Sequence, residues 1–133
     1  MIQTAKTIPA LATALMIACS PLTAAQAQDL TVDFKFDASS KCSNTSPEIR
    51  VGNIPEGTVA FKVRLRDRNA PGYNHGGGQV PNDGSGLIPK GALKERYKGP
   101  CPPSGSHTYV FTVKAIDAND DTLAEGEAKQ RFP

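Results

Sequence analysis

The sequence predicts an all-β protein, a small antiparallel β-sandwich with little helix. Several stretches alternate between apolar and polar residues with a period of two, as strands with one buried face do. The segments between them are rich in proline, glycine and asparagine, which form turns and interrupt helices. The chain has 133 residues, which is the length of one domain at most.

Residues 1–27 have the pattern of a secretory signal peptide. Lys6 is the only charged residue among them, an apolar segment covers residues 10–18, and small residues lead up to Ala27, after which we expect cleavage. The apolar segment is too short to span a bilayer. We therefore expect residues 28–133 to form a single exported domain, periplasmic or secreted, with no transmembrane segment after signal removal.

Two alternatives for this N-terminal segment stay open. One is a membrane anchor or an ordinary helix. The other is a lipoprotein signal, because residues 15–19 loosely resemble a lipobox that would attach lipid at Cys19. Met16 stands where such a box usually has leucine, which argues against the second alternative.

The charge balance argues against a nucleic acid as the partner. Without Lys6, the domain keeps 14 basic and 13 acidic residues, a formal charge of +1. Such a balance gives no basic stripe along the sequence that would neutralise a row of phosphates.

Two cysteines remain after the expected cleavage, Cys42 and Cys101. In an oxidising compartment, an even number of cysteines predicts that they form a disulfide. Closing a loop of about 60 residues would stabilise the domain by roughly 4 kcal/mol in the chain-entropy model. The alternative is a pair of free, buried thiols.

The first half of the domain predicts three strands, at residues 30–36, 48–51 and 59–66, with a polar loop and a proline-glycine turn between them. The third strand has an apolar face consisting of Val59, Phe61, Val63 and Leu65. Its opposite face carries the cations Lys62, Arg64 and Arg66. We interpret these cations as a solvated strand face rather than a binding patch.

Residues 67–86 are dominated by glycine, proline and asparagine, and they predict a long loop that is either functional or disordered. Residues 87–97 are ambiguous. A helical turn over residues 92–96 is compatible with their composition but is too short to be stable alone.

Residues 107–116 predict a central strand, because both of its alternating faces carry apolar residues. The three prolines among residues 99–103 exclude a helix or an inner strand there, so a rigid loop leads into His107. Residues 117–121 predict a turn, and residues 123–132 predict a last alternating strand.

Residues 99–111 resemble the late motif of the phosphatidylethanolamine-binding protein family, in particular its bacterial Raf kinase inhibitor-like branch. That motif is a glycine, a proline, an optional cysteine, two prolines, a short spacer with glycine, and then His-Arg-Tyr-Val-Phe. Other segments resemble family motifs and follow one another in the family's order. Residues 42–47 resemble its segment of cysteine and Ser-Pro, residues 51–58 its Ile/Val-Pro-x-Gly-Thr turn, and residues 67–71 its Asp-Pro-Asp-x-Pro motif. His75 stands at the histidine of the family's His-Trp motif, and Tyr97 at the tyrosine of its Gly-Tyr-x-Gly-Pro motif.

The resemblance implies a minimal version of the family's antiparallel Greek-key β-sandwich, with a small surface pocket for an anion. Phosphate, a carboxylate or a phospholipid head group is the implied ligand, bound without enzymatic activity, cofactor or metal. The pocket residues implied by position are Asp67, His75, His107 and Tyr109, with Pro102 and Pro103 in the pocket wall.

The chemistry of these residues suits an anion. The two histidines are the only ones in the chain, and imidazoles supply positive charge and hydrogen-bond donors near neutral pH. The hydroxyl of Tyr109 is a further donor, and Asp67 is able to fix a histidine tautomer. Backbone amides of residues 76–78 are candidates for an anion-binding nest.

Four positions depart from the family pattern. Arg68 replaces a proline, Asn69 an aspartate, Gly76 a tryptophan and Thr108 an arginine. Because an acid and a base are lost together, we predict that Asn69 and Thr108 lie near one another, where an ion pair has been removed. The lost tryptophan predicts a wider pocket with a more mobile loop. The family's C-terminal helices are also missing, because only a turn precedes the last strand.

Other chemistries fit the sequence less well. His75 and the glycines after it resemble an esterase oxyanion loop, but the sequence has no G-x-S-x-G motif. Asp67, His75 and His107 form a possible metal site without compact ligand spacing. Serines in residues 104–106 are interpreted as turn formers rather than nucleophiles. Residues 117–121 lack the spacing of a calcium loop.

The leading hypothesis is therefore an exported, non-enzymatic binding module with a small anion pocket. The alternative is a degenerate relative without a small ligand, which serves a structural or protein-interaction role in the periplasm. A weak hydrolase is the third hypothesis.

Overall fold

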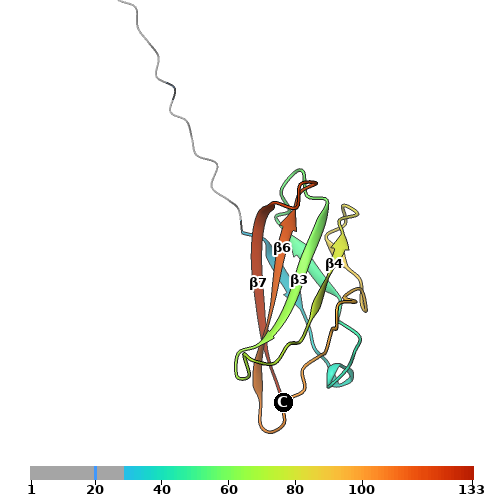
Figure 1. Cartoon of the computed structure of the whole chain (residues 1–133), viewed down its shortest axis with the longest axis vertical. Coiled ribbons are helices and arrows are strands. Elements are labelled where there is room, and N and C mark those ends of the chain that lie inside the picture. The colour runs from blue at the N-terminus through green and yellow to red at the C-terminus, as the bar shows by residue number, and fades with distance from the viewer. Residues whose placement is uncertain (1–19, 21–28) are drawn as a thin grey trace, which may run out of the picture.

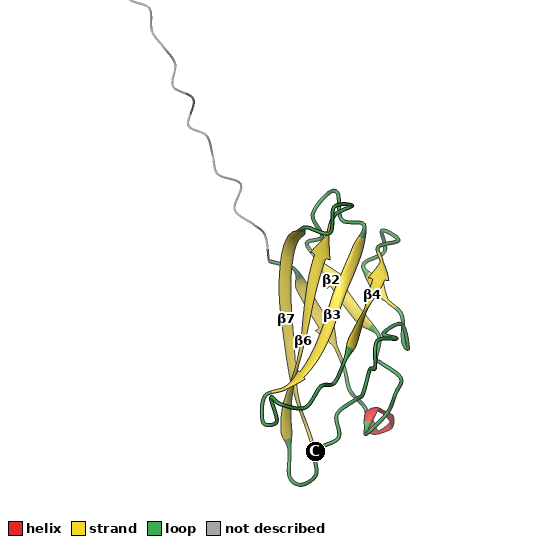
Figure 2. Cartoon of the chain, viewed as in Figure 1, coloured by secondary structure: helices red, strands yellow, loops and turns green. Residues whose placement is uncertain are grey.

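The computed structural model describes residue 20 and residues 29–133, and these form two antiparallel β-sheets packed face to face (Figures 1 and 2). The only helical element in these residues is the short 3-10 helix η1 (Ala38–Ser40). The all-β prediction is therefore confirmed. Most of the predicted signal peptide, with its cleavage site and the alternative lipid site at Cys19, lies outside the described residues.

The smaller sheet has three strands in the order β1-β2-β5, and the larger sheet has four in the order β4-β3-β6-β7. No helix in the part of the chain that the structure describes is long and apolar enough to cross a membrane. The strands are β1 (Thr31–Phe34), β2 (Ile49–Gly52), β3 (Ala60–Asp67), β4 (Gly77–Pro81), β5 (Leu87–Ile88), β6 (His107–Ile116) and β7 (Thr122–Phe132).

Strand β6 is central in the larger sheet, as its sequence predicts. It pairs with β3 on one side and with β7 on the other. On its outer face, Val110 and Ile116 are buried. On its inner face, the side chains between the two sheets are fully buried, and they are Tyr109, Phe111, Val113 and Ala115. The core of the sandwich is therefore built around β6.

The glycine-rich segment differs from the prediction of a long loop, because it contains the edge strand β4. Gly77 permits this pairing with β3, since a Cβ atom there would overlap the carbonyl oxygen of Val63. No helical turn forms at residues 92–96, and Glu95 instead makes a β-bridge with Gly77. Val59 was predicted to point inward but is 47% exposed, because β3 begins one residue later.

The predicted disulfide joins Cys42 to Cys101, whose Cα atoms lie 4.6 Å apart. It connects the loop after η1 to the proline segment that precedes β6. Backbone hydrogen bonds reinforce this connection, because Cys42 N–H donates to the carbonyl of Pro100 (2.8 Å) and Gly99 N–H to that of Ser43 (2.7 Å). The segment that leads into His107 is therefore fixed on both sides.

Replacing both cysteines by serine should lower the free energy of unfolding by roughly 4 kcal/mol, because the bridge joins residues 59 positions apart. Urea denaturation measures this loss. Reducing the unmodified protein should give the same loss, and the double variant should not respond to the reductant. A measured mass of the oxidised protein that corresponds to two free thiols would contradict the prediction.

Candidate functional site

The candidate site lies at the end of the larger sheet where β3 finishes and β6 begins. Asp67, the last residue of β3, pairs with Tyr109. His107 is the first residue of β6 and pairs with Phe132 at the end of β7, so the C-terminus lies at the same end of the molecule (Figure 1). Because side chains alternate along a strand, His107 and Tyr109 share the inner face of β6.

Asp67 and His107 form a close pair in which Nδ1 of the imidazole lies 2.6 Å from the carboxylate. The carboxylate is buried, and its other oxygen accepts hydrogen bonds from the amides of Asn69 (2.8 Å) and Ala70 (3.2 Å). Burial by itself raises the pKa of Asp67, but the hydrogen bonds from His107 and the two amides outweigh it and hold the pKa below its usual value. The ionised carboxylate therefore keeps the His107 proton on Nδ1 and leaves Nε2 for another partner.

Tyr109 lies beneath this pair and is fully buried. Its hydroxyl oxygen accepts the amide N–H of Cys101 (3.2 Å), and its ring stacks on His107 with centroids 6.3 Å apart. Burial, followed by the negative charge of Asp67, raises the pKa of Tyr109 to about 12. The hydroxyl therefore keeps its proton at neutral pH and remains a hydrogen-bond donor.

His75 completes the cluster from the segment before β4. Its ring meets that of Tyr109 edge to face at 5.4 Å, and its Nδ1–H donates to the carbonyl of Lys98 (2.7 Å). His75 is only 3% exposed, whereas the His107 side chain is 16% exposed. The structure thus brings the four predicted residues together, but His107 is the histidine that reaches the surface.

The two predicted wall residues lie on the chain between the disulfide and β6. Pro102 is half-buried and Pro103 is exposed. Of these two, Pro102 is the one that packs against the body of the domain. Their role as a pocket wall stays a prediction.

Asn69 and Thr108 lie next to one another, as their joint departure from the family pattern predicts. The amide of Thr108 donates to the side-chain oxygen of Asn69 (2.8 Å), and the amide of Arg68 donates to the carbonyl of Thr108 (2.8 Å). A neutral hydrogen bond therefore joins the two positions at the edge of the site.

Gly76 does not widen a pocket, and that prediction is wrong. Its φ is +68°, and a Cβ atom there would overlap the carbonyl oxygens of Glu95 and Arg96, so the chain itself fills the space. The prediction of an anion-binding nest also fails at Gly76 and Gly77. The Gly76 amide donates to the side chain of Asn74 (2.9 Å) and the Gly77 amide to the carbonyl of Glu95 (3.0 Å).

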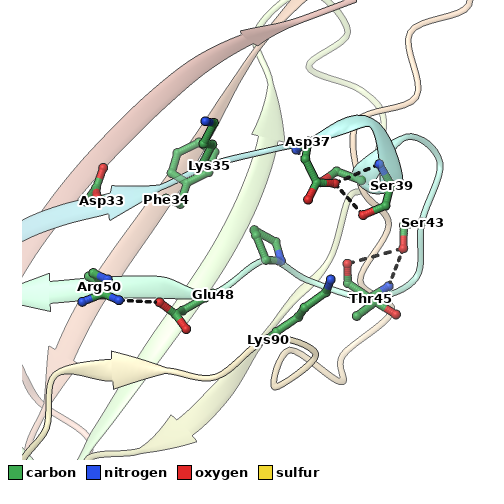
Figure 3. A pocket seen from close by; sticks show the side chains of 12 residues that line it. Asp33, Phe34, Lys35, Asp37, Ser39, Ser43, Thr45, Glu48, Arg50 and Lys90 are labelled. Atoms are coloured by element: carbon green, nitrogen blue, oxygen red, sulfur yellow. Dashed lines mark hydrogen bonds and ion pairs between the residues drawn. The ribbon is translucent and has the colours of Figure 1, made fainter.

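Three hollows of the described surface have linings that do not include Asp67, His107 or Tyr109. The one in Figure 3, about 710 Å³, lies between β1, η1 and β2 and is lined by side chains of both charges. Some of its groups bind one another, because Arg50 pairs with Glu48 (2.9 Å) and Asp37 accepts the amide of Ser39 (2.8 Å) (Figure 3). No group of three or more histidine, cysteine or acidic residues suited to a metal occurs in the described part of the chain.

Replacing Asp67 by asparagine should lower the free energy of unfolding by about 1–3 kcal/mol at neutral pH, because the donors around it lose a charged acceptor. The lowered pKa means that the stabilisation by Asp67 is complete above its unfolded value of 3.8 and is lost as the pH falls through the lower folded value. Urea denaturation at several acidic pH values should therefore show a flatter acid limb for Asp67→Asn. Asp33→Asn, on the exposed part of β1, is the control. A variant at position 67 with the original acid limb would refute this role.

Replacing Gly76 by alanine should destabilise the protein by more than about 1 kcal/mol, since the added Cβ is strained by the positive φ and also meets backbone. Gly84→Ala is a matched control, because Gly84 has a φ of +87° with nothing within 4 Å of its added Cβ. Comparing the unfolding of the two variants by heat or urea separates the destabilisation caused by atomic overlap from that caused by the positive φ. Equal losses in the two variants would show that the contact with residues 95–96 is unimportant.

Comparisons with known proteins agree with this fold. Residues 74–132 match the family model described as phosphatidylethanolamine-binding protein. The UPF0098 protein YbhB of Escherichia coli K12 is 35% identical over 105 residues, covering 62% of this chain and 66% of the relative. A UPF0098 protein of Methanothermobacter thermautotrophicus is 28% identical over 111 residues, covering 65% of this chain and 70% of the relative.

Two solved structures share the fold. One is E. coli YbcL, described as a new member of the mammalian PEBP family, with a TM-score of 0.60 and 20% identity over 79% of this chain and 98% of that one. The other is CT736 of Chlamydia trachomatis, a putative phosphatidylethanolamine-binding protein homologue, with a TM-score of 0.62 and 17% identity over 81% and 94%. The matched segment contains His75, the proline loop and β6, which carry most of the cluster. These matches support the assignment of the chain to the phosphatidylethanolamine-binding protein family.

Proposed function

We propose that this protein is an exported, non-enzymatic binding module whose site for a small anion is centred on His107. The observation that carries the proposal is the pair of His107 and the buried Asp67, 2.6 Å apart at the end of β6. The ligand is a phosphate, a carboxylate or a phospholipid head group. The match to YbhB covers 66% of that relative. The ligand and the partners of this protein are therefore proposed here and are not taken from the comparison.

Each member of the cluster has a separate task in binding. Asp67 holds Nδ1 of His107, so protonation of the ring places the new proton on Nε2, where it faces a ligand. The carboxylate also stabilises the imidazolium through a charge-assisted hydrogen bond. Tyr109 stays protonated and fully buried, so it supports the pair of His107 and Asp67 from inside the domain. The exposed Arg68 adds positive charge at the same end of the molecule.

A periplasmic or secreted location fits the disulfide, since such bonds persist in oxidising compartments. The signal-like residues 1–27 support the same location. Export would place the His107 site in contact with small ions and envelope lipids.

The burial of two cluster members favours the alternative of a structural or protein-interaction domain without a small ligand. His75 and Tyr109 are almost inaccessible, and each has a hydrogen bond to the backbone of residues 98–101. In that case the cluster would serve only to fix the proline segment before β6. The two functions differ in whether His107 responds to anions.

Nuclear magnetic resonance (NMR) titration of the imidazole groups decides between them. Phosphate, acetate and phosphoethanolamine should each be added to the protein, whose two histidines give two separate sets of signals. We expect saturable shifts at His107 at millimolar ligand, because a protonated imidazole supplies both charge and a hydrogen-bond donor. His107→Gln should abolish binding, whereas Asp33→Asn should not change it. No shift at His107 with any of the three ligands would refute the anion site.

A further inference from the structure

The outer face of β3 forms part of a groove that the sequence did not predict. The groove has a volume of about 1000 Å³ and lies along β3 and β4, between residues 71–76 and residues 94–96. Two carboxylates line it, Glu95 and Glu125. Six cations line it as well, and they are Lys62, Arg64, Arg66, Lys94, Arg96 and Lys114. Cations that are dispersed in the sequence therefore gather on one concave surface.

Some of these cations are paired and some are not. Lys62 pairs with Asp120 (2.6 Å), Arg66 lies 3.8 Å from Glu127, and Lys114 lies 3.6 Å from Glu125. Arg64, Lys94 and Arg96 form no ion pair with any residue that the structure describes. Glu95 also lines the groove without an ion-pair partner among the described residues, so three unpaired cations face one unpaired carboxylate. A recess with an excess of positive charge concentrates anions.

The groove continues into an adjoining hollow of about 510 Å³ that shares Tyr73, Asn74, Lys94 and Arg96 with it. The hollow adds Lys98 and has no carboxylate in its lining. Tyr97 also lines it, and the buried Tyr97 hydroxyl has no hydrogen-bond partner among the described residues. We refer to the two adjoining hollows together as the basic track.

Uncharged side chains in the track indicate what kind of polyanion fits. Asn74 and Gln79 offer amide groups, which hydrogen-bond to hydroxyls in either direction. Tyr73 is 53% exposed and presents an aromatic ring of the kind that covers apolar ligand surface. Sugar chains combine hydroxyls with apolar ring faces, whereas a polyphosphate chain has neither. A recessed track also suits a chain better than a flat membrane.

We propose that this track binds an acidic polysaccharide, whose carboxylates meet Arg64, Lys94 and Arg96. The track shares only His75 with the cluster around His107, so this site does not depend on the proposed anion site. Arg96 has a φ of +54°, a backbone conformation that is rare for arginine. The backbone packed around Arg96 holds this conformation and so fixes the direction of its Cα–Cβ bond.

The test measures binding of oligogalacturonate, a uronic-acid chain, by calorimetry at low salt. We expect saturable binding that weakens as salt is added, and no binding of neutral dextran. The double variant Arg64→Gln/Lys94→Gln should bind roughly tenfold more weakly. Lys129→Gln/Arg131→Gln removes the same charge from exposed positions on β7 that do not line the track, and it should bind like the unmodified protein.

Three outcomes would overturn the proposal. The first is equal weakening in both double variants, which would indicate attraction by net charge alone. The second is binding of polyphosphate or anionic vesicles without binding of oligogalacturonate. The third is loss of oligogalacturonate binding in His107→Gln, which would place the ligand at the other site. Conversely, retention of binding in that variant supports a separate site, whatever the NMR titration shows for small anions.

Discussion

The antiparallel pairing of β3 with β6 is the interaction on which the rest of the structure depends. It runs from Ala60 opposite Ile116 to Asp67 opposite Tyr109. The same register buries the apolar face of both strands and places the Asp67 carboxylate beside the His107 imidazole. A slip by one residue would turn Tyr109 to the outer face and separate this pair. Fold and candidate site are therefore specified by one strand pairing.

The buried carboxylate of Asp67 connects that pairing to the loops. An ionised group in this position is stable only because three donors replace its water, namely His107 and the amides of Asn69 and Ala70. Tyr109, beneath them, binds the amide of Cys101, and the disulfide fixes Cys101 to the opposite loop. A change in the protonation of Asp67 would therefore alter the hydrogen bonds of the proline segment as well as the contact with His107.

Local patterns predicted the parts of the structure that depend on local rules. The alternation of residues 107–116 determined both the central strand and the shared face of His107 and Tyr109, and an even pair of cysteines indicated the disulfide. Asp67 and His75 lie far from β6 in the sequence, and only the family resemblance placed them in the cluster. Strand β4 was missed because its glycines pair through the backbone and leave no apolar alternation. No feature of the sequence indicates how deeply His75 is buried.

Gly76 explains why the basic track also escaped prediction. Its missing side chain lets the carbonyls of Glu95 and Arg96 pack against the chain, next to the bridge between Gly77 and Glu95. This contact holds the segment with Lys94 and Arg96 beside β4, where both residues line the same groove as the cations of β3. A side chain at this position would overlap the backbone of residues 95–96, so that packing requires glycine. The same departure from the family pattern that predicts a wider anion pocket therefore leaves room for residues 95–96, and Lys94 and Arg96 of this segment line the basic track.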